Sequence, residues 1–293
     1  MIDKLVVIGV GLIGGSLACA LRKAGWVREI VGVGRGLANL EAALELGVID
    51  SYSQDAARAV ADADMVVIGA TLGSTAEILE TIAPVLGVAT VVTDVGSTKA
   101  DVIVAARATL GVHFPRFVPG HPIAGTEMSG AAAAFAELYV DHHIILTPLV
   151  DTDANALARV QAMWEATGAQ VSRMAVEDHD RVLAATSHLP HMLAFTLVDM
   201  LATASDADDI FAFAAGGFRD FTRIASSSPE MWRDIALSNR EALLTMCENF
   251  SVRLDHLMQA LRGGDGATLE RSFQRAKEAR DRCLVPEAYA RRQ

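Results

Sequence analysis

The polar residues best suited to chemistry gather first in one short segment near the middle of the chain. This segment runs from Gly120 to Glu127 and reads Gly-His-Pro-Ile-Ala-Gly-Thr-Glu. The imidazole of His121 has an ordinary pKa near neutrality, so it is a candidate general base. Thr126 and Glu127 are close enough in sequence to belong to the same site. The surrounding glycines and proline predict a fixed, exposed loop.

A second polar segment, from Asp94 to Lys99, follows the apolar run at residues 90–93. In open α/β sheets, ligands bind beyond the carboxyl ends of the strands. Ser97 could therefore donate a hydrogen bond to a substrate or orient a histidine. It could equally cap the helix that follows, and the two roles do not exclude each other.

Two histidines three residues apart, His188 and His191, stand in the segment Ser-His-Leu-Pro-His. Ser187 is expected to cap a helix and Pro190 to lie in its first turn, which would put both imidazoles on one helix face. Such a pair could bind zinc, but no cysteine or third histidine has suitable spacing, so we expect no metal site. An anionic substrate is the favoured ligand.

Arginines in a glycine-rich segment form the last polar cluster. Gly216 and Gly217 open this segment, and Arg219 and Arg223 follow. A guanidinium can hold a carboxylate through two parallel hydrogen bonds, so both arginines are candidate carboxylate ligands. Trp232 comes shortly afterwards and could either line a pocket or pack in the core.

Short apolar runs that alternate with helical patterns must position these segments in the first half of the chain. Strands are expected at residues 5–8, 29–33, 65–68, 90–93, 117–118 and 143–146, with a further one at 170–174. Helices are expected at residues 16–24, 37–46 and 153–167. Strands this apolar, separated by helices, predict a parallel sheet covered on both faces. That is the α/β class with a Rossmann-type, doubly wound sheet.

Helical periodicity replaces the strands after about residue 172. Helices are expected at residues 191–201, 230–258 and 269–282, with a loop at 263–266. We therefore divide the chain into an α/β domain at residues 1–172 and an all-helical C-terminal domain at residues 173–293.

A glycine fingerprint indicates the ligand of the α/β domain. Gly9-Val10-Gly11-Leu12-Ile13-Gly14 fits the pattern G-x-G-x-x-G, directly after the first strand and at the start of a helix. In that context the first glycine permits a tight turn, the second lets the backbone approach a pyrophosphate, and the third lets helix and strand pack closely. The N–H groups at the helix start, including those of Leu12 and Ile13, then bind the phosphates. Residues 1–172 are thus expected to bind a dinucleotide.

The end of the second strand bears on which dinucleotide is bound. An NAD site usually has an acid about 20 residues after the glycines, but Gly34 stands there and Arg35 follows. An arginine without a neighbouring acid accommodates a 2′-phosphate, which favours NADP. Arg35 could also be a solvated loop residue, so NAD or mixed use stays open. Thr71, after the third strand, is assigned to the same cofactor site.

Composition excludes several other classes of protein. The 293 residues are 52% hydrophobic and carry a formal net charge of −11. These values argue against a disordered chain and against binding to nucleic acid or an anionic membrane. The three cysteines form no Cys-x-x-Cys pair, which favours a reducing compartment. We find no basic leader and no run of about 20 apolar residues, so a cytoplasmic protein is expected.

Taken in order, these segments resemble the prephenate/arogenate (cyclohexadienyl) dehydrogenase family of tyrosine biosynthesis, in its monofunctional form. The resemblance covers nearly the whole chain. It rests on the glycine fingerprint, the segments around Ser97, His121 and His188, and the segments 217–223 and 231–234. The family often has an acid at the end of the second strand, so Gly34 departs from its pattern.

The resemblance implies oxidative decarboxylation of a cyclohexadienyl ring that carries a C4 hydroxyl and a C1 carboxylate, with hydride transfer to NAD(P). By analogy, His121 takes the hydroxyl proton, Ser97 orients His121, and Arg223 holds a substrate carboxylate. The other substrate-binding residues that the resemblance implies are His188, His191, Glu127, Thr126, Gly216, Gly217 and Trp232. Family members dimerise through the helical domain, so we expect a homodimer.

Two alternatives stay open at this point. Another two-domain dehydrogenase, of the β-hydroxyacid type, would generally use a lysine in its helical half, but none occurs between Glu177 and Arg262. A non-enzymatic, nucleotide-binding redox sensor would explain the fingerprint but not His121, the histidine pair and Arg223 together. No residue that we can identify selects prephenate over arogenate.

Overall fold

The computed structural model describes residues 1–284. By its internal contacts it divides into two compact units, of which the first is Met1–Leu243 and the second begins at Leu244. The domain boundary expected near residue 172 lies inside the first unit and stays a prediction.

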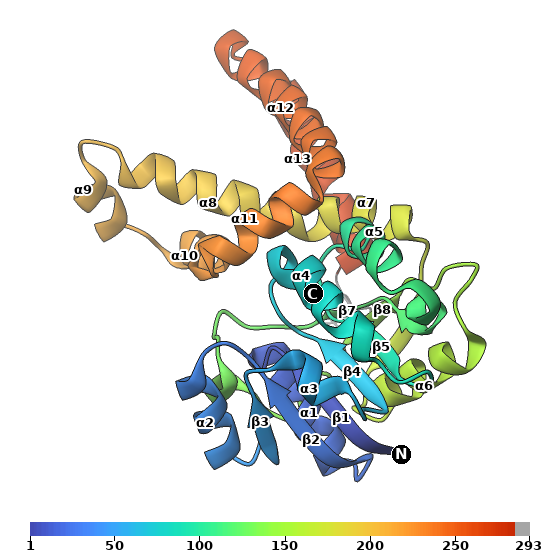
Figure 1. Cartoon of the computed structure of the whole chain (residues 1–293). Coiled ribbons are helices and arrows are strands. Elements are labelled where there is room, and N and C mark those ends of the chain that lie inside the picture. The colour runs from blue at the N-terminus through green and yellow to red at the C-terminus, as the bar shows by residue number, and fades with distance from the viewer. Residues whose placement is uncertain (285–293) are drawn as a thin grey trace. The chain divides into compact units, whose positions relative to one another are not determined.

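The first unit is built on a six-stranded sheet in which every paired strand is parallel (Figure 1). The strand order is β3-β2-β1-β4-β5-β6. The strands are β1 (Ile2–Ile8), β2 (Val27–Val33), β3 (Ser51–Ser53), β4 (Met65–Ile68), β5 (Val91–Asp94) and β6 (Phe117–Val118). The expected Rossmann-type class is confirmed, and β3 is a strand that the sequence did not predict.

Helices cover both faces of this sheet. The α-helices of this half are α1 (Leu12–Lys23), α2 (Leu37–Glu45), α3 (Ala56–Val60), α4 (Thr75–Ile82), α5 (Ala100–Thr109) and α6 (Ala154–Glu165). Four short 3₁₀ turns join them: η1 (Leu72–Ser74), η2 (Ala83–Val85), η3 (Gly111–Arg116) and η4 (Ala131–Ala133). Buried residues of α1, α2 and α6 form one apolar cluster, and those of α3, α4 and α5 form another.

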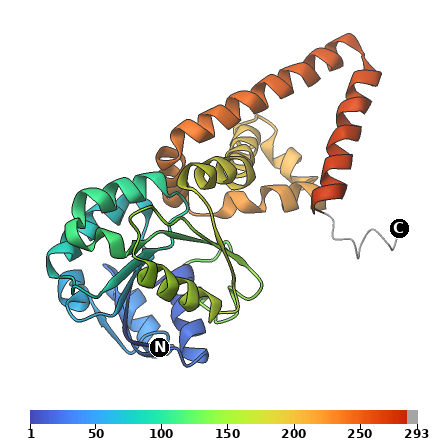
Figure 2. The same cartoon turned by 90° about the vertical axis from the view of Figure 1, so that its right-hand side faces the viewer.

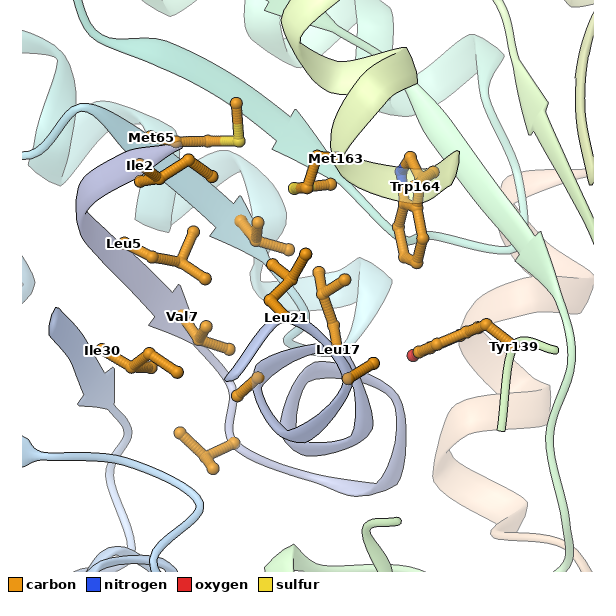
Figure 3. Close-up of a cluster of buried hydrophobic side chains, with 14 of the residues drawn as sticks. Ile2, Leu5, Val7, Leu17, Leu21, Ile30, Met65, Tyr139, Met163 and Trp164 are labelled. Carbon is orange, nitrogen blue, oxygen red and sulfur yellow. The ribbon is translucent and has the colours of Figure 1, made fainter. Parts of the chain in front are cut away.

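The central strand β1 contributes to both clusters because successive side chains of a strand point to opposite faces. Leu5 and Val7 belong to the cluster with α1 and α6, whereas Val6 and Ile8 belong to the other. Figure 3 shows the first cluster, in which Leu17 and Leu21 of α1 lie between Val7 of β1 and Trp164 of α6. Burial on both faces fixes the register of β1, and with it the place of the glycine turn that follows.

A second, three-stranded sheet was not expected. Its order is β7 (Gly120–Ile123), β8 (His143–Leu146) and β9 (Gln170–Arg173), with β7 antiparallel and β9 parallel to β8. Residues 143–146 were assigned to the main sheet, and that assignment is wrong. The expected exposed loop around His121 is also wrong: His121 pairs with Ile145 and is 8% exposed. Pro122 is tolerated there because β7 is an edge strand.

Helices alone follow β9 in the described residues. In the first unit they are α7 (Val176–Leu183), the π turn η5 (Ala184–His188), α8 (Leu189–Ala202), α9 (Ala207–Ala212), α10 (Gly216–Thr222), the 3₁₀ turn η6 (Arg223–Ser226) and α11 (Pro229–Ser238). The helix α12 (Arg240–Gly263) runs on into the second unit, which also holds α13 (Gly266–Leu284). Figure 2 shows α12 and α13 joined at one end by the turn at Gly264, the loop that was expected at residues 263–266.

The single helix expected at residues 230–258 is divided at Asn239, and that prediction is wrong. The backbone of Asn239 leaves the helical region, with φ −106° and ψ 33°. Its buried side chain donates to the carbonyl of Asp180 at 2.8 Å and lies 3.0 Å from His188 Nδ1. These contacts to a distant part of the chain compensate for the broken helix, and no local sequence signal reports them. Of the helices described, none is long and apolar enough to span a membrane.

Candidate active site

The carboxyl ends of the parallel strands place the expected cofactor and catalytic segments at one edge of the sheet. The glycine turn follows β1, Thr71 follows β4, and the segment from Asp94 to Lys99 follows β5. Since β1, β4 and β5 are neighbours in the sheet, these three segments lie next to one another. This edge is where ligands of open α/β sheets bind.

The glycine turn fits the close approach of a dinucleotide. Gly9 has φ +96°, and a Cβ built on it would lie 2.5 Å from the carbonyl carbon of Gly69. A Cβ on Gly14 would lie 2.5 Å from the oxygen of Gly9, so both positions are closed. A Cβ on Gly11 meets nothing within 4 Å, and the first turn of α1 holds no acid. The open backbone at Gly11 and the free N–H groups of Leu12 and Ile13 suit a pyrophosphate.

Two further cofactor candidates lie at the ends of β2 and β4. Arg35 is exposed, its carbonyl accepts a hydrogen bond from Gln54, and none of the ion pairs among the described residues uses its guanidinium. Gly34 has space for a side chain, since a Cβ there would meet only Leu40, at 3.5 Å or more. Thr71 precedes η1, and its hydroxyl lies 3.0 Å from that of Ser74.

A chain of buried hydrogen bonds begins at His121. Its Nδ1 lies 2.9 Å from Nε2 of His179, whose own Nδ1 lies 2.7 Å from Oδ1 of Asp180. His179 is fully buried, and Asp180 is 7% exposed. The carboxylate of Asp180 also accepts the backbone N–H groups of Lys99 and Ala100, each at 2.9 Å. Asp180 therefore caps the start of α5 and holds His179 at the same time.

This arrangement corrects two expectations for Ser97. Ser97 does not cap α5, because Lys99 is the N-cap residue and Asp180 supplies the acceptor. Among the described residues no hydrogen bond joins Ser97 to His121, and His179 occupies the Nδ1 side of that ring. Ser97 still lies in the turn after β5, so contact with a substrate hydroxyl stays a prediction.

A fully buried ion pair fixes the strand that carries His121. The ammonium of Lys99 donates to the carboxylate of Asp94 and, at 2.7 Å, to the carbonyl of Gly120. Asp94 also accepts the N–H of Gly120 at 3.2 Å. Both backbone groups of the residue before His121 are thus held by one pair. Removal of one partner from such a pair typically costs about 3–5 kcal/mol, because it leaves an uncompensated buried charge.

The histidine pair surrounds Trp232, as a shared helix face would require. The ring of His191 stacks on Trp232 with centroids 3.6 Å apart, and the ring of His188 meets it edge-on at 6.1 Å. His188 Nε2 and Trp232 Nε1 are buried and form no hydrogen bond of good geometry among the described residues, although the backbone of Ser97 lies near enough to His188 to act against the lowering of its pKa. Two orphaned buried polar atoms are expensive in a folded protein, so they point to a polar ligand in this region.

The predicted cap at Ser187 is wrong. Ser187 lies within the π turn η5, which joins α7 to α8 without a break, and its carbonyl accepts from His191 Nδ1 at 2.9 Å. Pro190 has no N–H to donate to the preceding turn. A π turn changes the hydrogen-bond register at this point, so the helix passes the proline and continues.

The predicted carboxylate ligand Arg223 forms an ion pair with Glu127. Arg223 Nη1 lies 3.1 Å from Glu127 Oε2, and both side chains are exposed. Thr126 accepts the N–H of Met128 in the same segment, at 3.2 Å. Gly216 and Gly217 begin α10, where an added Cβ would meet nothing within 4 Å. Glu127 and Arg223, named separately from the sequence, are therefore brought together.

Electrostatics favour neutral imidazoles here. Burial lowers the pKa of His121 well below the ordinary imidazole value, and the neighbouring His179, Lys99 and His188 act in the same direction. Burial likewise lowers the pKa of His188 to about 4. Burial lowers the pKa of His191 too, and the charge of Arg223 adds to the effect. At neutral pH His121 thus has a lone pair with which to accept a proton.

Four residues of this site were not predicted: His179, Asp180, Lys99 and Asn239. His179 and Asp180 stand in the run Glu-Asp-His-Asp, which resembles the solvated face of an acidic helix. Lys99 ends the polar segment that follows β5, and the sequence analysis gave it no role. The one available signal was a lysine and an aspartate, Lys99 and Asp94, flanking the glycine of a strand-end turn.

The sheet, the glycine turn and the buried histidines at its edge are those of a dinucleotide-dependent dehydrogenase. Two family models match the chain: the prephenate dehydrogenase nucleotide-binding domain over residues 17–173 and the prephenate dehydrogenase dimerization domain over residues 175–275. The chain belongs to the prephenate dehydrogenase family. Membership decides against a β-hydroxyacid dehydrogenase and a redox sensor.

Individual relatives agree with the family match. The chain is 37% identical to a cyclohexadienyl dehydrogenase of Zymomonas mobilis, over 94% of each chain. It is 38% identical to a prephenate dehydrogenase of Bacillus subtilis, over 96% of this chain and 76% of the relative. Among solved structures, prephenate dehydrogenase of Aquifex aeolicus with hydroxyphenyl propionate and NAD⁺ has a TM-score of 0.89 at 37% identity, covering 96% of this chain and 98% of that one. Arogenate dehydrogenase of Synechocystis has a TM-score of 0.78 at 31% identity, covering 96% and 100%.

The glycine geometry predicts opposite outcomes for two alanine variants. Gly14→Ala should lower the melting temperature, because its Cβ would overlap the Gly9 carbonyl, which is backbone and cannot move aside. Gly11→Ala should melt like the native protein but weaken dinucleotide binding at least tenfold, since its methyl would stand where the pyrophosphate approaches. Thermal melting and fluorescence titration with dinucleotide separate the two. A Gly11→Ala protein that binds dinucleotide normally would contradict the assignment.

Proposed function

We propose that the protein catalyses the oxidative decarboxylation of prephenate, arogenate or both, with His121 as the general base. The observation that carries the proposal is the buried, neutral imidazole of His121, which is held by His179 and follows Gly120, itself bonded to Asp94 at the carboxyl end of β5. The match to an Aquifex aeolicus enzyme solved with hydroxyphenyl propionate and NAD⁺ supports it, because that ligand carries the phenol ring of the expected product.

The reaction asks the protein mainly for positioning and one base. A dinucleotide held at the turn of Gly9, Gly11 and Gly14 would supply the acceptor for the hydride of C4. His121 takes the proton of the C4 hydroxyl, and loss of CO₂ from C1 makes the ring aromatic, which supplies the driving force. Arg223 exchanges its partner Glu127 for a substrate carboxylate. His188 and Trp232 offer their unpartnered nitrogens to polar groups of the substrate.

His121→Asn tests the base. The variant should bind dinucleotide normally and lower kcat by about 10²–10⁴-fold, the usual effect of losing a general base. In the native enzyme the low pKa of His121 keeps it unprotonated at pH 7, so kcat/KM should be level there. It should fall only at acid pH below the ordinary imidazole range, as the imidazole becomes protonated. Normal turnover by His121→Asn with either substrate would refute the proposal.

Arg223→Ala tests substrate binding. Loss of a hydrogen bond to a charged group typically costs about 1.5–3 kcal/mol, so KM for the substrate should rise at least tenfold and lysine should recover only part. Arg181→Ala is a matched control, because Arg181 forms an exposed ion pair with Asp178 at 2.9 Å. If Arg223→Ala leaves KM unchanged and lowers only the melting temperature, Arg223 is a surface ion pair.

NADP is the cofactor that we propose, because Gly34 stands where an acid is usual and Arg35 forms no ion pair with any of the described residues. Arg35→Ala should raise the Kd and KM for NADP and barely change those for NAD. Gly34→Asp fits the space beside Leu40, and its charge should repel a 2′-phosphate and accept from a ribose 2′-hydroxyl, which moves the preference toward NAD.

Arg28→Ala is the control for the cofactor variants, since Arg28 lies at the other end of β2 in an exposed ion pair with Asp3. Binding titrations give a readout that does not depend on turnover. Native enzyme that uses NAD at least tenfold better than NADP in kcat/KM would show the preference to be wrong.

A cytoplasmic homodimer is the assembly that we propose. The match to a dimerization domain over residues 175–275 supports it. So do the large apolar side chains exposed along α12 and α13, which are Leu244, Phe250, Val252, Leu254, Leu261 and Phe273.

A further inference from the structure

Two buried hydrogen bonds link His121 to His179 and His179 to Asp180, and their donors and acceptors depend on one another. His121 Nδ1 and His179 Nε2 lie 2.9 Å apart, so one of them must carry the hydrogen and the other the lone pair. The same holds for His179 Nδ1 and Asp180 Oδ1, at 2.7 Å. A neutral imidazole has only one N–H, so the donor or acceptor role of Asp180 determines the tautomer of His179, and the tautomer of His179 determines that of His121.

The protonation state of Asp180 determines both tautomers. Burial acts to raise the pKa of Asp180, but the hydrogen bonds from His179 and from the N–H groups of Ala100 and Lys99 outweigh it and hold the pKa below its ordinary value. The carboxylate is therefore ionised and can only accept. His179 must donate from Nδ1, which leaves the lone pair on Nε2. His121 must then donate from its own Nδ1, and its lone pair is left on Nε2.

We propose that His179 and Asp180 are positioning residues that fix the tautomer of His121, so that the ring always presents the Nε2 lone pair to the substrate. This inference rests on the proposed role of His121 as the base. The opposite tautomer would set the lone pairs of His121 Nδ1 and His179 Nε2 against each other in a buried site, or would require Asp180 to become a donor.

The hydrogen bonds from His121 to His179 and Asp180 also provide a place for the proton that His121 receives. When Nε2 takes the hydroxyl proton, the hydrogen on Nδ1 can pass to His179 Nε2. The positive charge then lies on His179 beside the carboxylate of Asp180, and no atom is gained or lost. Lys99 and His188 also face His121, and both disfavour an imidazolium there. Neither bonds to its Nδ1, so His179 is the hydrogen-bonded partner to which that proton can move.

Nitrogen NMR of protein labelled with ¹⁵N-histidine measures the tautomer directly, without turnover. The His121 signals are those that His121→Asn removes. In the free native protein at pH 7 we expect a protonated Nδ1 and a bare Nε2. A protonated Nε2 would overturn the inference even if the enzyme is fully active.

Asp180→Asn should reverse the donor and acceptor in each hydrogen bond between residue 180, His179 and His121. The reason is that an amide nitrogen facing His179 donates a hydrogen bond where the carboxylate accepted one. We expect the His121 tautomer to reverse and kcat to fall at least roughly 10²-fold, with dinucleotide binding kept. Asp178→Asn is the matched control: it is the same substitution on an exposed residue of α7 and should change neither tautomer nor kcat. An Asp180→Asn protein with native tautomer and native kcat would reject the proposal.

A second pair of variants covers the case in which loss of the α5 cap impairs folding of Asp180→Asn. The side-chain oxygen of His179→Gln can still accept from His121 Nδ1, whereas His179→Leu cannot. We expect the glutamine variant to keep the tautomer and lie within about tenfold of native kcat, and the leucine variant to lose both. Equal kcat in the two would overturn the inference. Normal turnover by His121→Asn would instead refute the proposed function and leave the NMR result standing.

Discussion

The rest of the site depends on the hydrogen bonds that the buried carboxylate of Asp180 in α7 accepts from His179 and from the start of α5. One oxygen accepts the N–H of Lys99 and the imidazole of His179, and the other accepts the N–H of Ala100. Its charge also suits the positive end of the α5 dipole. A single side chain of α7 thus ties the helical half of the first unit to the α/β half and holds the histidine that is bonded to His121. A substitution of Asp180 therefore changes the cap of α5 and the hydrogen bond to His179 at the same time.

His121 is held in place by two different kinds of interaction. Its ring is held by one hydrogen bond to His179, and the backbone of the preceding residue, Gly120, is held by the ion pair of Lys99 and Asp94. A buried ion pair contributes little net stability once its desolvation is counted. Its value here is geometric, because it fixes strand β7, which lies at the edge of a small sheet and has only one neighbour.

Much of the framework could be predicted from the sequence, because it depends on local patterns. The glycine turn, the apolar strands β1, β4 and β5, and the polar residues at their ends follow from periodicity and residue type. The second sheet could not be predicted, because Gly-His-Pro is typical of a loop and becomes a strand only through pairing with β8. Asn239 breaks a periodic helix in favour of contacts with Asp180 and His188. His179 was hidden among acids that usually face solvent, and long-range packing alone makes it the partner of His121.

The π turn η5 has a consequence for the directions in which three histidines of one continuous helix point. An α-helix rotates about 100° per residue, so His179 and His188, nine residues apart, would point in opposite directions on a regular helix. A π turn takes up about one extra residue, which reduces that angle to about 80° and brings His191 to within about 20° of His179. The π turn thus shifts the helical phase once between α7 and α8, so that residues on either side of it can face the same region of the protein.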